Sequence, residues 1–256
     1  MTSLAESTAI PANAEPLIEA RGLSAGYGPQ PVITDVNLEV YAGEVVTLLG
    51  PNGAGKTTTL LALSGELPPL SGQVLLDGAV TKAPLYKRAR NGLMFVTEEK
   101  SVFMGLNAQD NLRVARVDLE AALELFPELR RRLGVRAGLL SGGEQQMLTL
   151  ARALARRPRV LMADELSMGL APLVVKRLLD AVRHAANDQG TAVLLVEQHV
   201  RKALKYADRV YVMRRGRIEL AGTGSEMSKR TGEIEDQYLT AVVEEKQHEH
   251  EQQQER

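Results

Sequence analysis

Cysteine does not occur among the 256 residues, which excludes disulfide bonds, thiolate metal sites and a cysteine nucleophile. This absence favours a cytosolic setting. Net charge is also nearly absent, because 31 Lys and Arg balance 32 Asp and Glu, so nothing in the charge points to nucleic acid as a partner. No apolar run approaches the roughly 18 residues of a spanning helix, and the N-terminus lacks the layout of a signal peptide. If the protein works at a membrane, we expect another protein to hold it there.

Short buried strands alternate with helices along most of the chain, which predicts an α/β fold with a mainly parallel sheet. Strand patterns before residue 50 and near 73–76 predict an additional antiparallel β subdomain at the N-terminal side. A helical block at about 100–157 interrupts the alternation, and we interpret it as a helical subdomain. The folded domain is expected over residues 16–242. Residues 1–15 and the polar tail 243–256 are expected to be disordered.

A glycine loop, GPNGAGKT from Gly50 to Thr57, follows an apolar strand and precedes a helix expected from Lys56 to Ser64. Glycines let the backbone approach phosphate oxygens closely, and the helix N-terminus favours an anion. The lysine, Lys56, should reach the β- and γ-phosphates of a nucleotide, and the Thr57 hydroxyl should ligate Mg²⁺. The loop therefore predicts an ATP site, although a kinase or a GTPase would be built on the same loop.

A second apolar strand, Val160–Ala163, ends in two acids. At the carboxyl end of a parallel strand, Asp164 would lie beside the phosphate loop and support Mg²⁺. The next residue, Glu165, is placed to polarise the attacking water as a general base. Acids at strand ends are common, so the assignment depends on the glycine loop occurring in the same chain.

A third motif, LSGGEQQ from Leu140 to Gln146, lies just ahead of a helix. Its serine is a good N-cap and its two glycines allow close approach of a phosphate. Together with the loop and the acids, this motif resembles the signature of the ATP-binding-cassette (ABC) ATPases, over roughly residues 17–240. The resemblance implies that nucleotide domains dimerise head to tail and that Ser141 contacts the γ-phosphate of ATP bound by the other protomer.

The resemblance also implies roles for residues outside these motifs. It places Tyr27 where the family stacks an aromatic ring on adenine, and His199 where a switch histidine contacts the γ-phosphate. Glu98 stands where most relatives have a glutamine that senses Mg²⁺. The expected catalytic residues are Glu165, His199 and Lys56, and the expected metal ligands are Thr57, Asp164 and Glu98. The expected nucleotide contacts are Tyr27, Gly50, Asn52, Gly53, Ala54, Gly55, Lys56, Thr57, Thr58, Ser141, Gly142, Gly143 and Glu144.

Three further segments resemble the ATPase subunits of branched-chain amino acid importers: TEEKSVF at 97–103, SMGLAP at 167–172 and VEQH at 196–199. Urea and amide importers share much of this pattern. Some positions depart from the wider family. The Asp that most cassettes carry after the catalytic acid does not occur in SMGLAP, Leu166 replaces a proline, and Glu144 replaces the usual glutamine. None of these departures removes a phosphate ligand.

The resemblance implies a transport motor on the cytoplasmic face of the membrane that binds ATP and Mg²⁺. Its partners would be a second ATPase subunit, either a paralogue or a copy of itself, together with transmembrane permease subunits and a separate solute-binding protein. The apolar segment from Val102 to Met104 is where a permease helix is expected to dock. The alternative is an ABC ATPase of DNA repair or translation, which usually carries a long coiled-coil insertion or two cassettes. Neither feature occurs here, nor does the Asn-Lys-x-Asp motif of GTPases.

Overall fold

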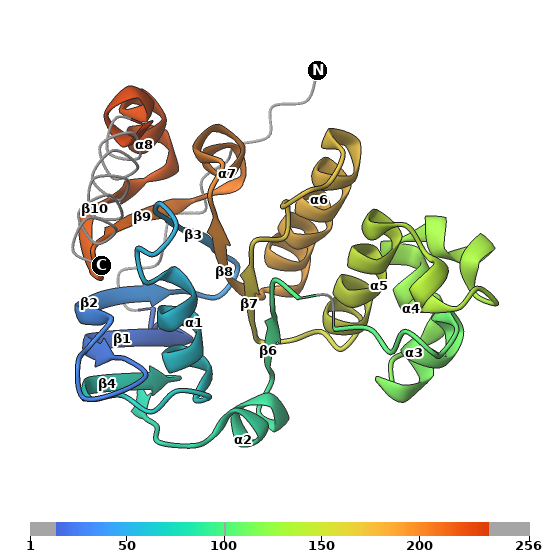
Figure 1. The fold of residues 1–256 in the computed structure, drawn as a ribbon, viewed down its shortest axis with the longest axis horizontal. Coiled ribbons are helices and arrows are strands. Elements are labelled where there is room, and N and C mark those ends of the chain that lie inside the picture. Colours follow the sequence, from blue (N-terminus) through green and yellow to red (C-terminus); the bar gives the residue numbers. More distant parts are fainter. Residues whose placement is uncertain (1–13, 100, 236–256) are drawn as a thin grey trace, which may run out of the picture.

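Two β-sheets with a helix between them form the larger part of the molecule (Figure 1). A computed structural model describes residues 14–99 and 101–235. The expected tail, and all but the last two residues of the expected lead-in, lie outside these residues. Among the described residues, no helix is long and apolar enough to cross a membrane.

The smaller sheet is antiparallel and has the order β2-β1-β4-β5. The larger sheet has the order β10-β9-β3-β8-β7-β6, and all its neighbours pair in parallel except β10 with β9. These findings confirm the expected α/β fold. The strands are β1 Ile18–Ala25, β2 Ile33–Val40, β3 Val45–Leu49, β4 Ser71–Leu76, β5 Ala79–Val80, β6 Leu93–Val96, β7 Val160–Asp164, β8 Ala192–Glu197, β9 Arg209–Arg214 and β10 Arg217–Thr223.

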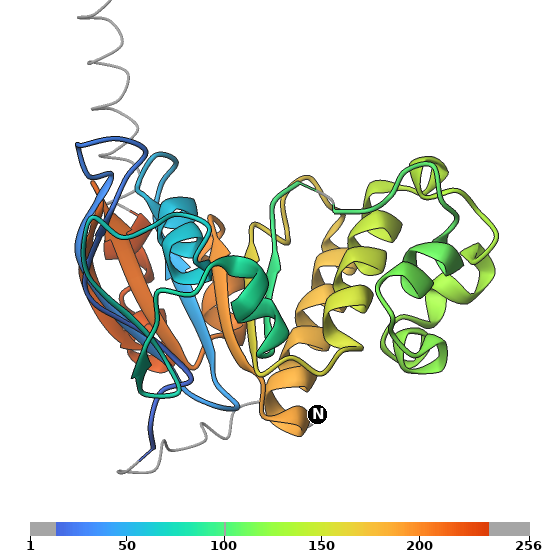
Figure 2. The same ribbon diagram turned by 90° about the horizontal axis from the view of Figure 1, so that it is seen from below.

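The helices lie between, beside and beyond the sheets (Figures 1 and 2). The α-helices are α1 Lys56–Ser64, α2 Leu85–Arg90, α3 Ala108–Val114, α4 Leu119–Leu125, α5 Gly142–Leu154, α6 Pro172–Gln189, α7 Val200–Tyr206 and α8 Gly224–Lys229; the 3-10 helices are η1 Pro127–Arg132 and η2 Ala137–Leu139. The structure therefore adds α2, α7 and α8 to the elements expected from the sequence. It also shows that the arginine-rich segment forms a 3-10 helix.

In the part of the chain that the structure describes, buried apolar side chains form three clusters. The first joins both sheets through α1, whose Leu60 and Leu63 are fully buried between them. The second joins the other face of the large sheet to α6 and to the block formed by α3, α4 and α5. The third lies under α7 and α8. Strands β3, β7 and β8 are buried along their whole length, because helices cover both faces of this part of the sheet.

Candidate nucleotide-hydrolysis site

The glycine loop runs from the end of β3 to the start of α1, in the geometry that a phosphate-binding loop requires. Gly55 has φ 102° and is the N-cap of α1. A Cβ atom at this position would lie 2.6 Å from Cγ2 of Ile33, and a Cβ on Gly50 would lie 2.5 Å from the carbonyl oxygen of Met213. Glycine is therefore required at both positions, by backbone conformation at Gly55 and by close packing at both.

The lysine of the loop is folded back over the loop backbone. Lys56 is only 5% exposed, and its Nζ donates to the carbonyl oxygens of Gly50 at 2.8 Å and Pro51 at 2.9 Å. Burial lowers the pKa of Lys56, while the negative charges of Glu165 and Asp164 oppose that change. The loop thus holds a cation at its centre, close to two acids, where an incoming phosphate can take over its hydrogen bonds.

Thr57 and Asp164, two of the expected metal ligands, are in direct contact. The Thr57 hydroxyl donates to Oδ2 of Asp164 at 2.8 Å. Asp164 is 2% exposed, and burial raises the pKa of its carboxyl group. Its other oxygen, Oδ1, is buried and accepts no hydrogen bond from the described residues. A buried carboxylate oxygen without a donor is a suitable ligand for a hard cation, so this pair fits Mg²⁺.

The third expected metal ligand, Glu98, is exposed in the segment after β6. It lies near enough to affect the electrostatics of the site, since its charge favours the protonated forms of both Lys56 and Asp164. No group of three or more His, Cys, Asp or Glu side chains that could hold a metal ion occurs in residues 14–99 and 101–235. A magnesium ion here would therefore be held by Thr57 and Asp164 together with phosphate oxygens and water, the usual arrangement for this ion.

Glu165 follows the last residue of β7 and has an unusual backbone conformation. Its φ of 49° lies in the left-handed region, which is costly for a residue with a side chain. Its backbone N–H donates to the carbonyl oxygen of Val196 at 2.9 Å. Its carboxylate Oε1 accepts a 2.5 Å hydrogen bond from Nε2 of Gln198. The expected general base is thus held by the end of the neighbouring strand β8.

The end of β8 contributes a further acid that the sequence interpretation did not include. Glu197 is 3% exposed, and burial raises the pKa of its carboxyl group to about 7, against the opposing effect of hydrogen bonds from Ser167. The Ser167 hydroxyl donates to Oε2 of Glu197 at 2.6 Å, while Oε1 is buried and has no partner among the described residues. His199, by contrast, is exposed at the start of α7, so its contact with a γ-phosphate stays a prediction.

The expected signature forms the start of α5. Ser141 and Glu144 make a reciprocal capping box, in which each side chain bonds the other residue's backbone N–H. Nε of Arg132 donates to the Glu144 carboxylate at 2.6 Å. Partial burial would raise the pKa of Glu144, but the donors of Ser141 and Arg132 outweigh it and lower that pKa. A Cβ on Gly143 would lie 3.0 Å from Val174, so the glycine allows close packing of α5 on α6.

The signature and the phosphate loop lie in different parts of the molecule. In both views, strands β7 and β8 separate α1, which begins at the phosphate loop, from α5, which begins at the signature (Figures 1 and 2). The Thr57–Asp164 hydrogen bond and the charge effects of Asp164 and Glu165 on Lys56 group these four residues together. Ser141, Gly142, Gly143 and Glu144 form a second, separate group at the start of α5.

The remaining expected nucleotide contacts lie on or near the phosphate loop. Asn52 and Gly53 are exposed, whereas Ala54 and Thr58 are buried. Tyr27 is 70% exposed in the turn between β1 and β2. That turn leads into Ile33, which packs against Gly55, so Tyr27 is carried by a segment that adjoins the loop.

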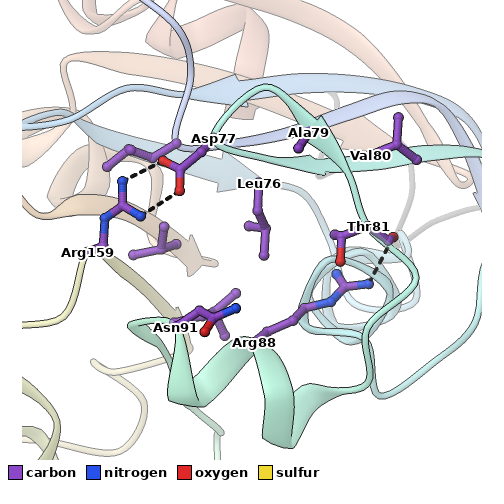
Figure 3. A pocket seen from close by; sticks show the side chains of 11 residues that line it. Leu76, Asp77, Ala79, Val80, Thr81, Arg88, Asn91 and Arg159 are labelled. Atoms are coloured by element: carbon purple, nitrogen blue, oxygen red, sulfur yellow. Dashed lines mark hydrogen bonds and ion pairs between the residues drawn. The ribbon is translucent and has the colours of Figure 1, made fainter.

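A cavity of about 250 Å³ lies away from these residues (Figure 3). Its lining includes Leu93 and Val160, the first residues of β6 and β7, whereas the phosphate loop follows the last residue of β3. The Asp77–Arg159 ion pair lies at one side of the cavity and the buried Arg88, which donates to backbone carbonyls, at another. Ligand sites of parallel sheets form at the carboxyl ends of the strands, so this cavity is no part of the nucleotide site.

Two polar side chains that bond to the loop of Glu165 were given no role by the sequence interpretation: Glu197 and Gln198. The signal that identified Asp164 and Glu165, polar residues at the end of an apolar strand, occurs again at the end of β8. The same rule applied to β8 would have found both residues.

Comparison with known proteins finds ATP-binding proteins of transport systems among its relatives. The chain is 38% identical over 227 residues to the high-affinity branched-chain amino acid transport ATP-binding protein BraG of Pseudomonas aeruginosa, covering 85% of this chain and 97% of that protein. It is 36% identical over 228 residues to the lipopolysaccharide export system ATP-binding protein LptB of Escherichia coli, covering 82% of this chain and 92% of that protein.

Two solved structures have the same fold. One is the ATP-binding subunit of an ABC transporter, with a TM-score of 0.74, 27% identity and coverage of 88% of this chain and 99% of that one. The other is a nucleotide-free ATP-binding cassette from an ABC transporter, with a TM-score of 0.75, 22% identity and coverage of 84% and 94%. The ABC transporter family model matches residues 33–167, more than half of the chain. The phosphate loop, the paired acids and these matches lead to one conclusion: this chain belongs to the ABC transporter family, as an ATP-binding ATPase subunit.

Proposed function

We propose that this subunit hydrolyses Mg-ATP at the Thr57–Asp164–Glu165 site to power uptake of branched-chain amino acids or a related small polar solute such as urea or an amide. The catalytic part of this proposal rests on one observation: the end of β7 lies against the phosphate loop that follows β3. There, Asp164 keeps one buried oxygen unpaired beside Thr57, and Glu165 follows directly. The solute is proposed from the likeness to BraG and from the segments at 97–103, 167–172 and 196–199.

In the proposed reaction, a water oxygen attacks the γ-phosphorus while Glu165 takes the water's proton, and the bond to the oxygen of ADP breaks. Lys56 stabilises the negative charge of the β- and γ-phosphates. Mg²⁺, held by Thr57 and Asp164, would neutralise charge on the phosphate oxygens. Tyr27 is proposed to stack on adenine and His199 to contact the γ-phosphate. Glu98 is proposed to respond to the bound ion.

The signature supports a composite site shared by two subunits. Ser141 begins α5 with two following glycines, and it lies in a different part of the chain from the loop that would hold ATP. In a head-to-tail pair, either with a paralogue or with a second copy of this chain, Ser141 would close on the partner's γ-phosphate. We propose that ATP binding closes the pair and that hydrolysis reopens it.

An exposed apolar patch supports a permease as the membrane partner. Phe103 and Met104, which are adjacent in the chain, are 49% and 48% exposed. The guanidinium group of Arg152 lies 5.3 Å from the centre of the Phe103 ring, which braces that ring at the surface. We propose that a permease helix docks at the segment from Val102 to Met104, holds the subunit on the cytoplasmic face of the membrane, and receives solute from a separate binding protein.

The variant Glu165→Gln tests the catalytic assignment, because glutamine has the same shape and cannot accept the proton. We expect ATP to bind with wild-type affinity, kcat to fall at least about 100-fold, and an ATP-bound dimer to accumulate. Turnover and size-exclusion chromatography with Mg-ATP measure these effects. Turnover at the wild-type rate would remove Glu165 as the base.

The likeness to LptB favours a second candidate, lipopolysaccharide export. Reconstitution with the cognate permease in vesicles separates the two. Uptake of labelled leucine, isoleucine or valine that needs ATP would support the proposed import, and uptake of urea instead would reassign the solute. ATP-dependent extraction of lipopolysaccharide with no solute uptake would contradict import.

A further inference from the structure

Glu144, in the first turn of α5, holds the proton that the Ser141 hydroxyl would donate to a phosphate. The hydroxyl donates to Oε2 of Glu144 at 2.9 Å, and the same oxygen accepts from the backbone N–H of Ser141 at 2.8 Å. Because a hydroxyl has one proton, Ser141 can donate to a partner's γ-phosphate only after its bond to Glu144 breaks. The signature serine is therefore already engaged within its own subunit.

The carboxylate of Glu144 would also lie close to a phosphate bound at the signature. A phosphate oxygen that accepts from the Ser141 hydroxyl at the usual distance of about 2.7 Å would lie no more than about 5.6 Å from Oε2 of Glu144. Partial burial opposes ionisation of Glu144, but the donors of Ser141 and Arg132 outweigh it and lower the pKa, so the carboxylate is charged at neutral pH. Two negative groups at this separation repel each other, so the signature contains a charge that opposes its own ligand.

Arg132 is placed to cancel that charge. Its Nε donates to Oε1 of Glu144 at 2.6 Å, which leaves Oε2 to Ser141. Arg132 is the last residue of η1, which is anchored in the core by the fully buried Leu129. The carbonyl oxygen of Arg132 accepts from the N–H of Val135 at 2.8 Å. The guanidinium group thus reaches the start of α5 from a segment whose backbone is held in place.

We propose that Arg132 is a positioning residue of the signature, which neutralises Glu144 and keeps that carboxylate in place when the Ser141 hydroxyl turns to the partner's phosphate. This inference rests on the proposed contact of Ser141 with ATP held by the other subunit. Once the hydroxyl has left, Oε1 of Glu144 still accepts from Arg132 and Oε2 still accepts from the backbone N–H of Ser141. Both oxygens therefore stay bonded within the subunit, and Arg132 acts through Glu144.

The same 3-10 helix offers a matched control in Arg130. Its guanidinium group donates to the carboxylate of Glu120 on α4 at 2.8 Å, and its side chain is 55% exposed, close to the 50% of Arg132. Loss of an exposed ion pair costs little stability in itself, so Arg130→Ala and Arg132→Ala should both fold. Only Arg132→Ala leaves an uncompensated charge beside Ser141.

Sedimentation of the full-length subunit with Mg²⁺ and a non-hydrolysable ATP analogue, and with its ATPase partner where that is a paralogue, measures closure of the pair without turnover. We expect Arg132→Ala to weaken this association about 10- to 100-fold, but less than about 3-fold in a Glu144→Gln background, which keeps the shape of Glu144 without its charge. Raising salt from about 50 mM to about 500 mM should shrink the defect, because salt screens exposed charges. Arg132→Lys should restore most of the association. Analogue binding by the isolated monomer should match the wild type in every variant.

Wild-type association in Arg132→Ala overturns the inference. An equal defect in the Glu144→Gln background also overturns it, because Arg132 would then act without Glu144, and so does an equal defect in Arg130→Ala or one that salt leaves unchanged. A wild type that associates with the analogue but does not hydrolyse ATP would contradict the proposed function instead, and the association results would still decide the role of Arg132. A wild type that does not associate would contradict both.

Discussion

The hydrolysis half and the signature half of this subunit are built in opposite ways. The first is assembled from distant segments, with Thr57 bonded to Asp164 and Gln198 bonded to Glu165 across parallel strand ends. The second is local: Ser141 and Glu144 satisfy each other within one helical turn, with Arg132 in support. Among the described residues, the hydrolysis half contains two unpaired buried carboxylate oxygens, on Asp164 and Glu197, whereas the signature half is satisfied by its own cap. The comparison indicates that the polar groups of the hydrolysis half need a bound ligand to be satisfied. The polar groups of the signature half are already paired within the chain, so that half can present a preformed surface to a partner.

The largest expected effect comes from blocking the signature. In Ser141→Arg, a long charged side chain would occupy the surface that is proposed to close on the partner's ATP. We expect hydrolysis to be abolished while the isolated monomer still binds ATP, because the phosphate loop lies elsewhere. Equilibrium ATP binding and a phosphate-release assay measure the two properties. Ser141→Ala, which removes only the cap, controls for damage to α5. Loss of ATP binding in the monomer would contradict the division into two halves.

A smaller effect, on the pH dependence of the free energy of unfolding, is expected from Glu197, the buried acid on the hydrolysis side. The pKa of Glu197 is raised from 4.5 to about 7 in the folded protein. Its stabilising contribution is therefore complete below pH 4.5 and is lost as pH rises to about 7. The shift corresponds to about 3 kcal/mol. In Glu197→Gln, which still accepts from Ser167, the free energy of unfolding should fall by about 3 kcal/mol less between pH 5 and pH 8 than in the wild type. Urea denaturation at both pH values measures this, and parallel curves would show that Glu197 does not titrate there.

The smallest expected effect is a loss of stability in a Glu144 variant. It distinguishes the role of Glu144 in capping α5 from a role in contacting the partner's nucleotide. Glu144→Ala removes half of a capping box and should lower the free energy of unfolding by about 1 kcal/mol. Thr223 and Glu226 form an equivalent box at the start of α8, so Glu226→Ala is a matched control with a similar cost. ATP turnover should fall in Glu144→Ala and stay unchanged in Glu226→Ala. Equal turnover in both variants would limit Glu144 to capping.

Local signals explain which parts of the structure could be predicted. The bounds expected for α1, Lys56 to Ser64, are those observed, because left-handed glycines, Gly55 and Gly65, flank the helix. The strands β3, β7 and β8 were recognisable as continuous apolar runs. Helices α2, α7 and α8, of six or seven residues each, were not predicted, whereas α3 and α4, of seven residues each, were expected as parts of the helical block.

The site was predictable where motifs are contiguous and unpredictable where strands bring residues together. Lys56, Thr57, Asp164 and Glu165 lie in two short motifs, and the structure brings them into one site. The bond from Gln198 to Glu165 depends on the pairing of β7 with β8, which no local pattern specifies. For the same reason, the direct contact between Thr57 and Asp164 was expected only as a shared metal site.

The left-handed backbone of Glu165 has a consequence for how this protein can be engineered. Glycine adopts that conformation freely, so the strain at this position, of order 1 kcal/mol or more, would vanish in Glu165→Gly. Where that gain exceeds the loss of the hydrogen bond from Gln198, selection for thermal tolerance alone would favour a change that removes the proposed general base. Catalytic activity keeps a glutamate at a backbone conformation that glycine adopts more easily. A library of variants screened for stability without an activity assay would therefore accumulate stable proteins that do not hydrolyse ATP.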